Sequence, residues 1–203
     1  NETVTAVLAN LQPHFGDALT ITPFANHTLI QPTHPPTKRE ASPSGDQPFM
    51  NIFDYEFTVD APLTAVSDFH RDTSALKKLA LPLTFVQLHK VEPMGEGSVS
   101  EFTMWLGPLP VRWKAIHSNV SERGFTDTQA TGEGPAAFWQ HTHTFTPLSA
   151  EQTKIQEHIE FEHKPGTAGL LTRFLFSKPN LHILFGYRQW ATRRAVEKMK
   201  YEL

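Results

Sequence analysis

The chain lacks several features that would assign it to a functional class at once. It has no cysteine, which excludes disulfide bonds and thiolate chemistry and fits a reducing compartment, so we expect a cytoplasmic protein. No apolar run approaches the roughly 18 residues of a membrane-spanning helix. The net charge is -3, whereas nucleic-acid binding relies on clustered lysine and arginine. We therefore expect neither a transmembrane segment nor a nucleic-acid partner.

Common cofactor and nucleophile signatures are also missing. The sequence holds no serine nucleophile elbow, no phosphate-cradling glycine loop and no dinucleotide-binding fingerprint. We therefore expect no cofactor.

Large apolar side chains are abundant. The 203 residues include 15 Phe and 4 Trp, enough to bury the core of one domain. The stretch Gln31–Pro48 carries five of the 16 prolines and has the composition of a linker. We expect an N-terminal extension and proline-rich linker over residues 1–48 and the main domain over 49–203. The extension contains a helical candidate, Thr3–Leu11, and is either a strap on the main domain or a flexible segment.

From Asn51 onward the hydrophobic pattern has a period of two, which predicts strands. Short turns between successive segments favour an antiparallel meander. The predicted strands are Ile52–Val59, Thr84–Lys90, Ser98–Leu106, Val111–Val120, Gly124–Ala130, Phe138–Pro147 and Thr153–Glu162. Two short helices, Pro62–His70 and Thr73–Leu79, are expected after the first strand.

After Gly166 the period changes to that of a helix. An apolar stripe begins at Leu170 and continues to Met199, with Pro179 expected to break or kink it. The order of elements predicts an α+β fold in which a curved antiparallel sheet wraps around a long C-terminal helix.

Four stretches resemble the SRPBCC superfamily, whose helix-grip fold is shared by START lipid-transfer domains and polyketide cyclase-like proteins. They are Phe53–Asp72, Trp105–His117, Gly124–Phe145 and Glu157–Gly166. The resemblance spans Phe49 to about Glu202 and implies a ligand cavity between the concave sheet face and the long helix.

Strand alternation predicts which side chains face that cavity. The central stretch FWQHTHTF, residues 138–145, turns two aromatic rings and two imidazoles to one face. The expected ligand-binding residues are Trp113, Phe125, Gln129, Trp139, Phe145, Ile159, Phe161 and, on the helix, Phe185. The expected polar or catalytic residues are His117, Asp127, His141, His143 and Glu157.

The turn lengths predict how these polar residues align. Closing the turns places His117 near Asp127 and His143 near Glu157, with Asp127 opposite His141 or His143. A polar row would then cross the sheet. Carboxylates beside imidazoles in an apolar cavity suit proton transfer, but they also suit the orientation of a ligand or a self-satisfied buried network.

Two further patterns carry less information. His141-x-His143 has a spacing suited to a first-row metal, with Glu157 or His158 as the third ligand, but no glutamate follows closely as in cupins, so we expect no metal. The basic residues of the last helix, Arg188 among them, are expected to form a solvated face.

The combined expectation is a soluble protein that binds a small hydrophobic molecule, lipid-, polyketide- or terpenoid-like. The alternative is a cyclase or dehydratase in which His143 or His141, paired with Asp127 or Glu157, transfers a proton. A third alternative is an interaction module whose proline-rich segment binds partners. The sequence indicates no oligomeric state.

Overall fold

The structure, a computed structural model, describes residues 19–24, 27–32 and 50–199. The chain divides into two compact units, Asn1–Gln47 and Pro48–Leu203. In the first unit, β1 (Leu19–Phe24) and β2 (His27–Pro32) form an antiparallel hairpin. The helix expected at Thr3–Leu11 and most of the proline-rich stretch lie outside the described residues.

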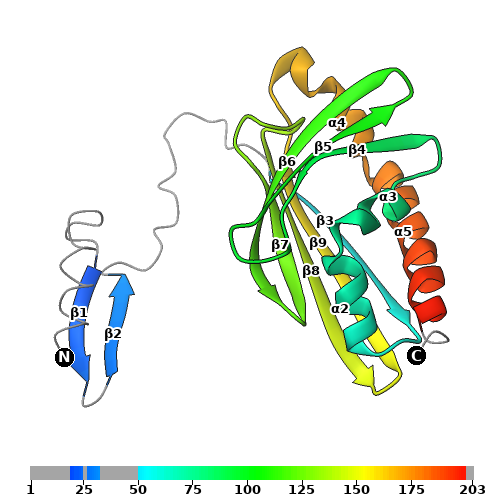
Figure 1. The fold of residues 1–203 in the computed structure, drawn as a ribbon. Coiled ribbons are helices and arrows are strands. Elements are labelled where there is room, and N and C mark those ends of the chain that lie inside the picture. Colours follow the sequence, from blue (N-terminus) through cyan, green and yellow to red (C-terminus); the bar gives the residue numbers. More distant parts are fainter. Residues whose placement is uncertain (1–18, 25–26, 33–49, 200–203) are drawn as a thin grey trace. The chain divides into compact units, whose positions relative to one another are not determined.

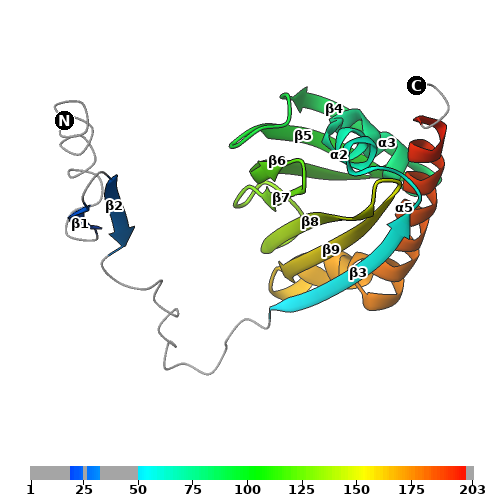
Figure 2. The same ribbon diagram turned by 90° about the horizontal axis from the view of Figure 1, so that it is seen from below.

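The second unit is built on one seven-stranded antiparallel sheet with the order β3-β9-β8-β7-β6-β5-β4. Figures 1 and 2 show the strands following one another around a curve, with α2, α3 and α5 on its inner side. The predicted meander is confirmed. The strands are β3 (Asn51–Val59), β4 (Thr84–Val91), β5 (Val99–Leu106), β6 (Leu109–Ser121), β7 (Gly124–Gln129), β8 (Phe138–Ser149) and β9 (Gln152–Glu162).

The helices also follow the expected order. After β3 come α2 (Leu63–Arg71), a short 3-10 turn (Thr73–Ala75) and α3 (Leu76–Leu79). A second 3-10 turn, Gly166–Gly169, leads into α4 (Leu170–Leu175) and then α5 (Lys178–Met199). The predicted break is present, and it leaves Pro179 in the first turn of α5, where its missing N–H is not needed. The α+β helix-grip arrangement is thus confirmed.

Two hydrophobic clusters pack between the sheet and the helices. One contains Phe57, Phe145 and Ile155. The other contains Trp139 and Phe185. Alternate residues of β8 and β9 are buried, as expected for strands with one face toward the interior. On β8, positions 141 and 143 lie between the two clusters, so the buried face changes there from apolar to polar.

A close backbone contact joins β7 to β8. Gly124 has φ +137°, and a Cβ there would lie 2.0 Å from the carbonyl oxygen of His143. Only glycine fits such a position without moving the neighbouring strand. This contact brings the start of β7 against the part of β8 that carries the histidines.

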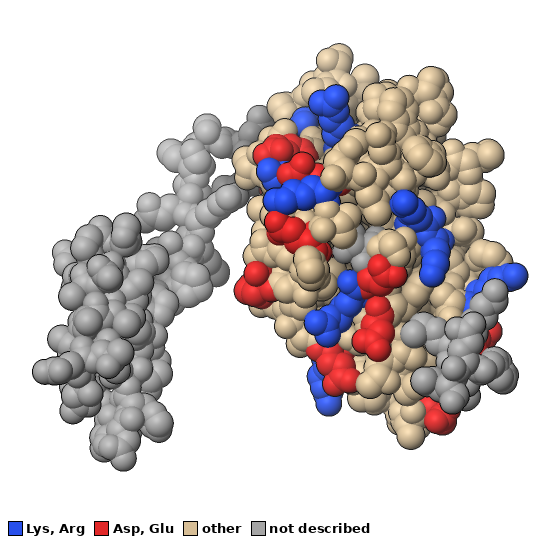
Figure 3. Space-filling model, viewed as in Figure 1, with Lys and Arg blue, Asp and Glu red and all other residues tan. Residues whose placement is uncertain are grey.

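The charged surface shows no separation of sign on the face seen in Figure 3. Lysine and arginine side chains are interspersed there with aspartate and glutamate. Among the described residues, no helix is both long enough and apolar enough to cross a bilayer.

Candidate functional site

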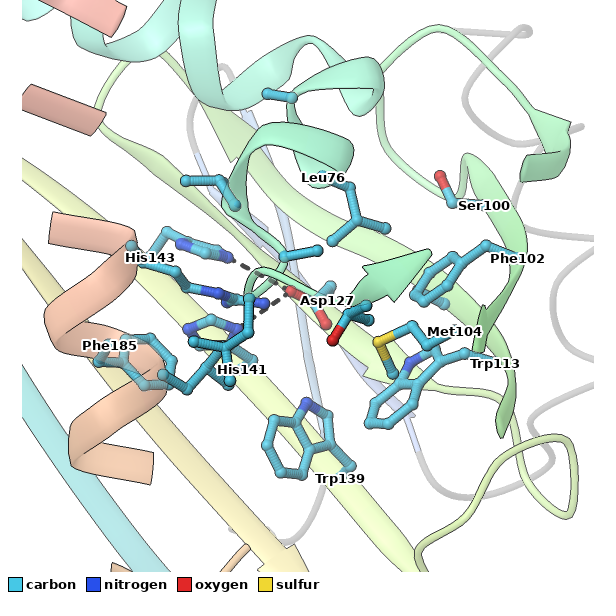
Figure 4. A pocket seen from close by; sticks show the side chains of 18 of the residues that line it. Leu76, Ser100, Phe102, Met104, Trp113, Asp127, Trp139, His141, His143 and Phe185 are labelled. Carbon is cyan, nitrogen blue, oxygen red and sulfur yellow. Dashed lines mark hydrogen bonds and ion pairs between the residues drawn. The ribbon is translucent and has the colours of Figure 1, made fainter. Parts of the chain in front are cut away.

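A pocket opens between the concave sheet face and α3, α4 and α5. Its volume is about 440 Å³, and its walls are mainly apolar. Figure 4 shows His141 and His143 pointing toward Asp127, with Phe102, Met104 and Trp113 beyond the carboxylate. The lining includes Leu76, Leu79, Ser100, Phe102, Met104, Trp113, Phe125, Trp139, Phe174, Phe176, Leu184 and Phe185.

The polar residues of the site are placed by strand register. Asp127 on β7 pairs directly with His141 on β8, and His143 on β8 pairs with Glu157 on β9. Side chains two residues apart on a strand share a face. Asp127, His141, His143 and Glu157, which we call the four-residue cluster, therefore meet on the concave side, as predicted.

Each imidazole of the four-residue cluster lies between the two carboxylates. Nε2 of His141 lies 2.8 Å and Nδ1 of His143 lies 2.7 Å from Oε2 of Glu157. On the other side, Nδ1 of His141 lies 3.5 Å and Nε2 of His143 lies 3.4 Å from Oδ2 of Asp127. The two ring centroids are 4.0 Å apart. The contacts form a closed cycle in which carboxylates and imidazoles alternate.

The two histidines have opposite electrostatic behaviour. Burial opposes the charged form of His143, but the contacts and charges of Glu157 and Asp127 raise its pKa to about 9. Burial, together with the adjacent charge of His143, lowers the pKa of His141. The positive charge of the pair therefore lies on His143.

Both carboxylates are held in the ionised form. Burial acts against this, yet the charge of His143 and the hydrogen bond of His141 lower the pKa of Glu157 well below its usual value. The pKa of Asp127 is also lowered, because the hydrogen bond from His143 and the charge of His141 outweigh its burial. Glu157 is almost fully enclosed, whereas the Asp127 side chain is 19% exposed and faces the pocket.

The fifth predicted polar residue bonds elsewhere. His117 pairs with Asp127 in register, as predicted, and lines the pocket. Its Nδ1 donates to the carbonyl oxygen of Ser98 at 3.0 Å and also lies 3.1 Å from the Ser98 hydroxyl. His117 is therefore a neighbour of the four-residue cluster, and its bond to Ser98 links β6 to the residue that precedes β5.

The expected apolar residues divide into two groups. Trp113, Phe125, Trp139 and Phe185 line the pocket. Phe145, Ile159 and Phe161 belong to the same hydrophobic clusters but are buried away from the pocket. Gln129 is turned away: its side-chain amide donates to Ala136 O at 3.0 Å and accepts from Ala136 N at 3.2 Å, which anchors the β7–β8 loop.

Among the pocket residues that were not predicted are two ionisable ones, His70 and Arg188. His70 on α2 is buried, its Nδ1 donates to the carbonyl oxygen of Val66 at 2.9 Å, and burial is the chief cause that lowers its pKa to about 4. Arg188 on α5 lines the pocket with its Nε buried and unpaired and its guanidinium over the ring of Phe185. The expectation that Arg188 belongs to a solvated face is wrong. Arg188 follows Leu181 and Phe185 at helical spacing, and this position in the apolar stripe indicates that it faces inward.

The four-residue cluster includes a set of groups that suits a metal ion. One ligand atom each from Asp127, His141 and His143 lies within 4.8 Å of the other two. Two imidazoles and one carboxylate are common ligands of first-row transition metals. Proton transfer, ligand anchoring and metal binding are therefore the chemical capacities of this site.

Comparison with known proteins identifies the fold. No family model matches the chain, and no curated protein matches it. Among solved structures, the Zhui aromatase/cyclase of a Streptomyces species is 19% identical with a TM-score of 0.53, over 73% of this chain and 92% of that chain. A START superfamily protein of Mycobacterium smegmatis is 13% identical with a TM-score of 0.55, over 73% and 98%.

A synthase has a similar fold. Norcoclaurine synthase of Thalictrum flavum, whose structure contains dopamine and hydroxybenzaldehyde, is 18% identical with a TM-score of 0.55, over 76% of this chain and 88% of that chain. These likenesses are likenesses of fold, and they confirm the fold that the sequence resemblance implied.

Proposed function

From the helix-grip fold that this chain shares with the SRPBCC superfamily, we propose that the domain binds a small, largely apolar organic molecule between the sheet and α5. The observation that carries the proposal is the pocket of about 440 Å³ with apolar walls and one polar end. This volume lies within the range of about 300–1,000 Å³ that small-molecule sites occupy.

The two ends of the pocket suit an amphipathic ligand. Phe102, Met104 and Trp113 offer aromatic and thioether contacts to a hydrocarbon or ring system. Asp127 and Arg188 at the other end offer an acceptor and a donor to its polar group. The similar folds of an aromatase/cyclase and of a protein that holds dopamine and hydroxybenzaldehyde support a lipid-, polyketide- or terpenoid-like ligand.

A second candidate function is acid–base catalysis of the cyclase or dehydratase type. The observation that favours it is geometric: Glu157 lies behind both imidazoles, while His141 and His143 reach the pocket surface. A carboxylate in that position fixes the orientation of an imidazole and increases its basicity. His143 or His141, paired with Asp127 or Glu157, would then move a proton on the bound molecule without a redox cofactor.

Ligand binding is tested by filling the pocket. Ala115 on β6 is 4% exposed and lines the pocket, whereas the next residue, Ile116, is 40% exposed on the opposite face. We would displace an apolar fluorescent probe from the full chain with decanoic acid, a naphthol and geraniol. Ala115→Phe should weaken probe binding at least about tenfold, and Ile116→Phe should not. Equal binding by both variants, or no probe binding by the wild type, would refute the proposal.

The two candidate functions are separated with His143→Ala. A carrier keeps its ligand with a modest change in affinity. An enzyme keeps binding but loses the product that mass spectrometry detects after incubation with a poly-β-ketone substrate mimic. Product formation that is unchanged in His143→Ala would exclude His143 as an acid–base catalyst.

A further inference from the structure

The four-residue cluster has more nitrogen–oxygen contacts than it has protons. Four ring nitrogens each face a carboxylate oxygen. A neutral imidazole carries only one N–H, so four hydrogen bonds would require both rings to be charged. Two imidazolium rings with centroids 4.0 Å apart repel each other, which favours a single positive charge on the pair. At least one nitrogen lone pair therefore faces a carboxylate oxygen.

The contacts differ on the two sides of the rings. On the Glu157 side, His141 Nε2 forms a hydrogen bond at 2.8 Å, whereas the buried Nδ1 of His143, 2.7 Å from the same oxygen, has no hydrogen-bond partner. On the Asp127 side both contacts are longer, at 3.5 and 3.4 Å, and only that of His143 Nε2 is a hydrogen bond. Ligand atoms placed about 2.1 Å from one tetrahedral metal ion are about 3.4 Å apart. The Asp127 side thus has the spacing of a coordination site.

We propose that Asp127 Oδ2, His141 Nδ1 and His143 Nε2 bind one divalent first-row transition-metal ion of the Zn²⁺ type. The ion takes the place of the missing protons on the Asp127 side. Glu157 then accepts the Nε2–H of His141 and lies 2.7 Å from Nδ1 of His143, which is the usual position of an outer carboxylate behind metal-bound histidines. This assignment reverses the sequence-based expectation of no metal and replaces Glu157 with Asp127 as the carboxylate ligand.

The fourth coordination position opens to the pocket. His141, His143 and Asp127 all line the pocket, whereas Glu157 lies behind them. Three protein ligands with one open position are typical of zinc sites that bind a substrate or water. An oxygen of the pocket ligand would complete the coordination. This inference goes beyond the proposed function, because an apolar molecule can occupy the pocket whether or not the ion is bound.

The test uses the full chain, dialysed against EDTA and then titrated with Zn²⁺ by calorimetry and with Co²⁺ by visible spectroscopy. The wild type should bind one ion per chain and give the d–d absorption of four- or five-coordinate Co²⁺. Asp127→Asn should weaken Zn²⁺ binding about 100-fold or more. Glu157→Gln should weaken it by about 10- to 100-fold while keeping the cobalt spectrum. Circular dichroism checks that each variant is folded.

A matched control is available on the other face of the sheet. His158 on β9 also lies between two carboxylates, 2.6 Å from Asp54 and 3.2 Å from Glu160, but without a second imidazole. His158→Gln should leave the stoichiometry, affinity and spectrum unchanged. Absence of stoichiometric binding by the wild type, or an equal loss in His158→Gln and Asp127→Asn, would overturn the site. Probe binding by the EDTA-treated protein tests the pocket separately.

Discussion

The buried carboxylate of Glu157 should be energetically coupled to the imidazole of His143. Oε2 of Glu157 lies 2.7 Å from Nδ1 of His143, and the two side chains are only 4% and 8% exposed. Replacing Glu157 with leucine removes the nearest negative charge from a buried imidazolium. Replacing His143 with phenylalanine removes the nearest positive charge from a buried carboxylate. Each single variant therefore leaves a buried charge with less compensation than before.

The size of the effect follows from the distance. At an effective dielectric constant of about 20, opposite charges 2.7 Å apart attract by about 6 kcal/mol, and desolvation offsets much of this. Breaking one partner of a buried pair usually costs about 3–5 kcal/mol of unfolding free energy. The double variant Glu157→Leu/His143→Phe has lost both charges. We expect it to be about 2–4 kcal/mol more stable than the sum of the two single effects predicts.

Urea unfolding of EDTA-treated protein, followed by tryptophan fluorescence, measures this coupling. With an m-value of about 2 kcal/mol/M, each single variant should lower the midpoint by about 1.5–2.5 M. Glu160 and His158 on the outer face, 36% and 44% exposed, form the matched control cycle. Their coupling should stay below about 1 kcal/mol. Additive effects of the Glu157 and His143 variants would refute the pairing.

Two further predictions concern residues outside the four-residue cluster. Gln129→Leu leaves the buried backbone groups of Ala136 unpaired, so it should lower stability by about 2–4 kcal/mol without changing probe affinity in the displacement assay. Gln140→Leu on the opposite face of β8 is the control and should cost less. The hydrogen bond with Asp54 raises the pKa of His158 in the folded state. The protonated His158 therefore stabilises the fold fully below its unfolded-state pKa, and this stabilisation is lost as the pH rises through its folded-state pKa. His158→Gln should therefore destabilise more at about pH 5.5 than at about pH 9 in urea titrations, and the reverse order would exclude that pair.

The register of the site was predictable because it depends on strand alternation and on short turns. Closing the turns placed His117 opposite Asp127 and His143 opposite Glu157, and both pairings are present. The longer loop before β8 left two partners for Asp127, and only the structure distinguishes His141 as its direct neighbour. A loop of that length has no fixed closing geometry. The sequence pattern alone therefore does not determine the register between β7 and β8.

The depth of a side chain behind the pocket was not predictable. Alternation assigns Trp139 and Phe145 to the same face of β8, yet only Trp139 reaches the pocket. The position of α2 decides this, since the ring centroids of its His70 and of Phe145 are 5.0 Å apart. Gln129 illustrates the same limit, because its partner Ala136 lies in a loop whose path no periodicity describes.

The pocket divides between two parts of the sheet. The cluster that contains Asp127, His143 and Glu157 is carried by three adjacent strands, β7 to β9, whereas Phe102 and Met104 come from β5, near the opposite edge. A change at either β5 residue reshapes the apolar wall without touching the strand pairings that align the charges. The fold can therefore acquire a new ligand shape and keep its chemistry, or lose its chemistry and keep its shape, through separate substitutions.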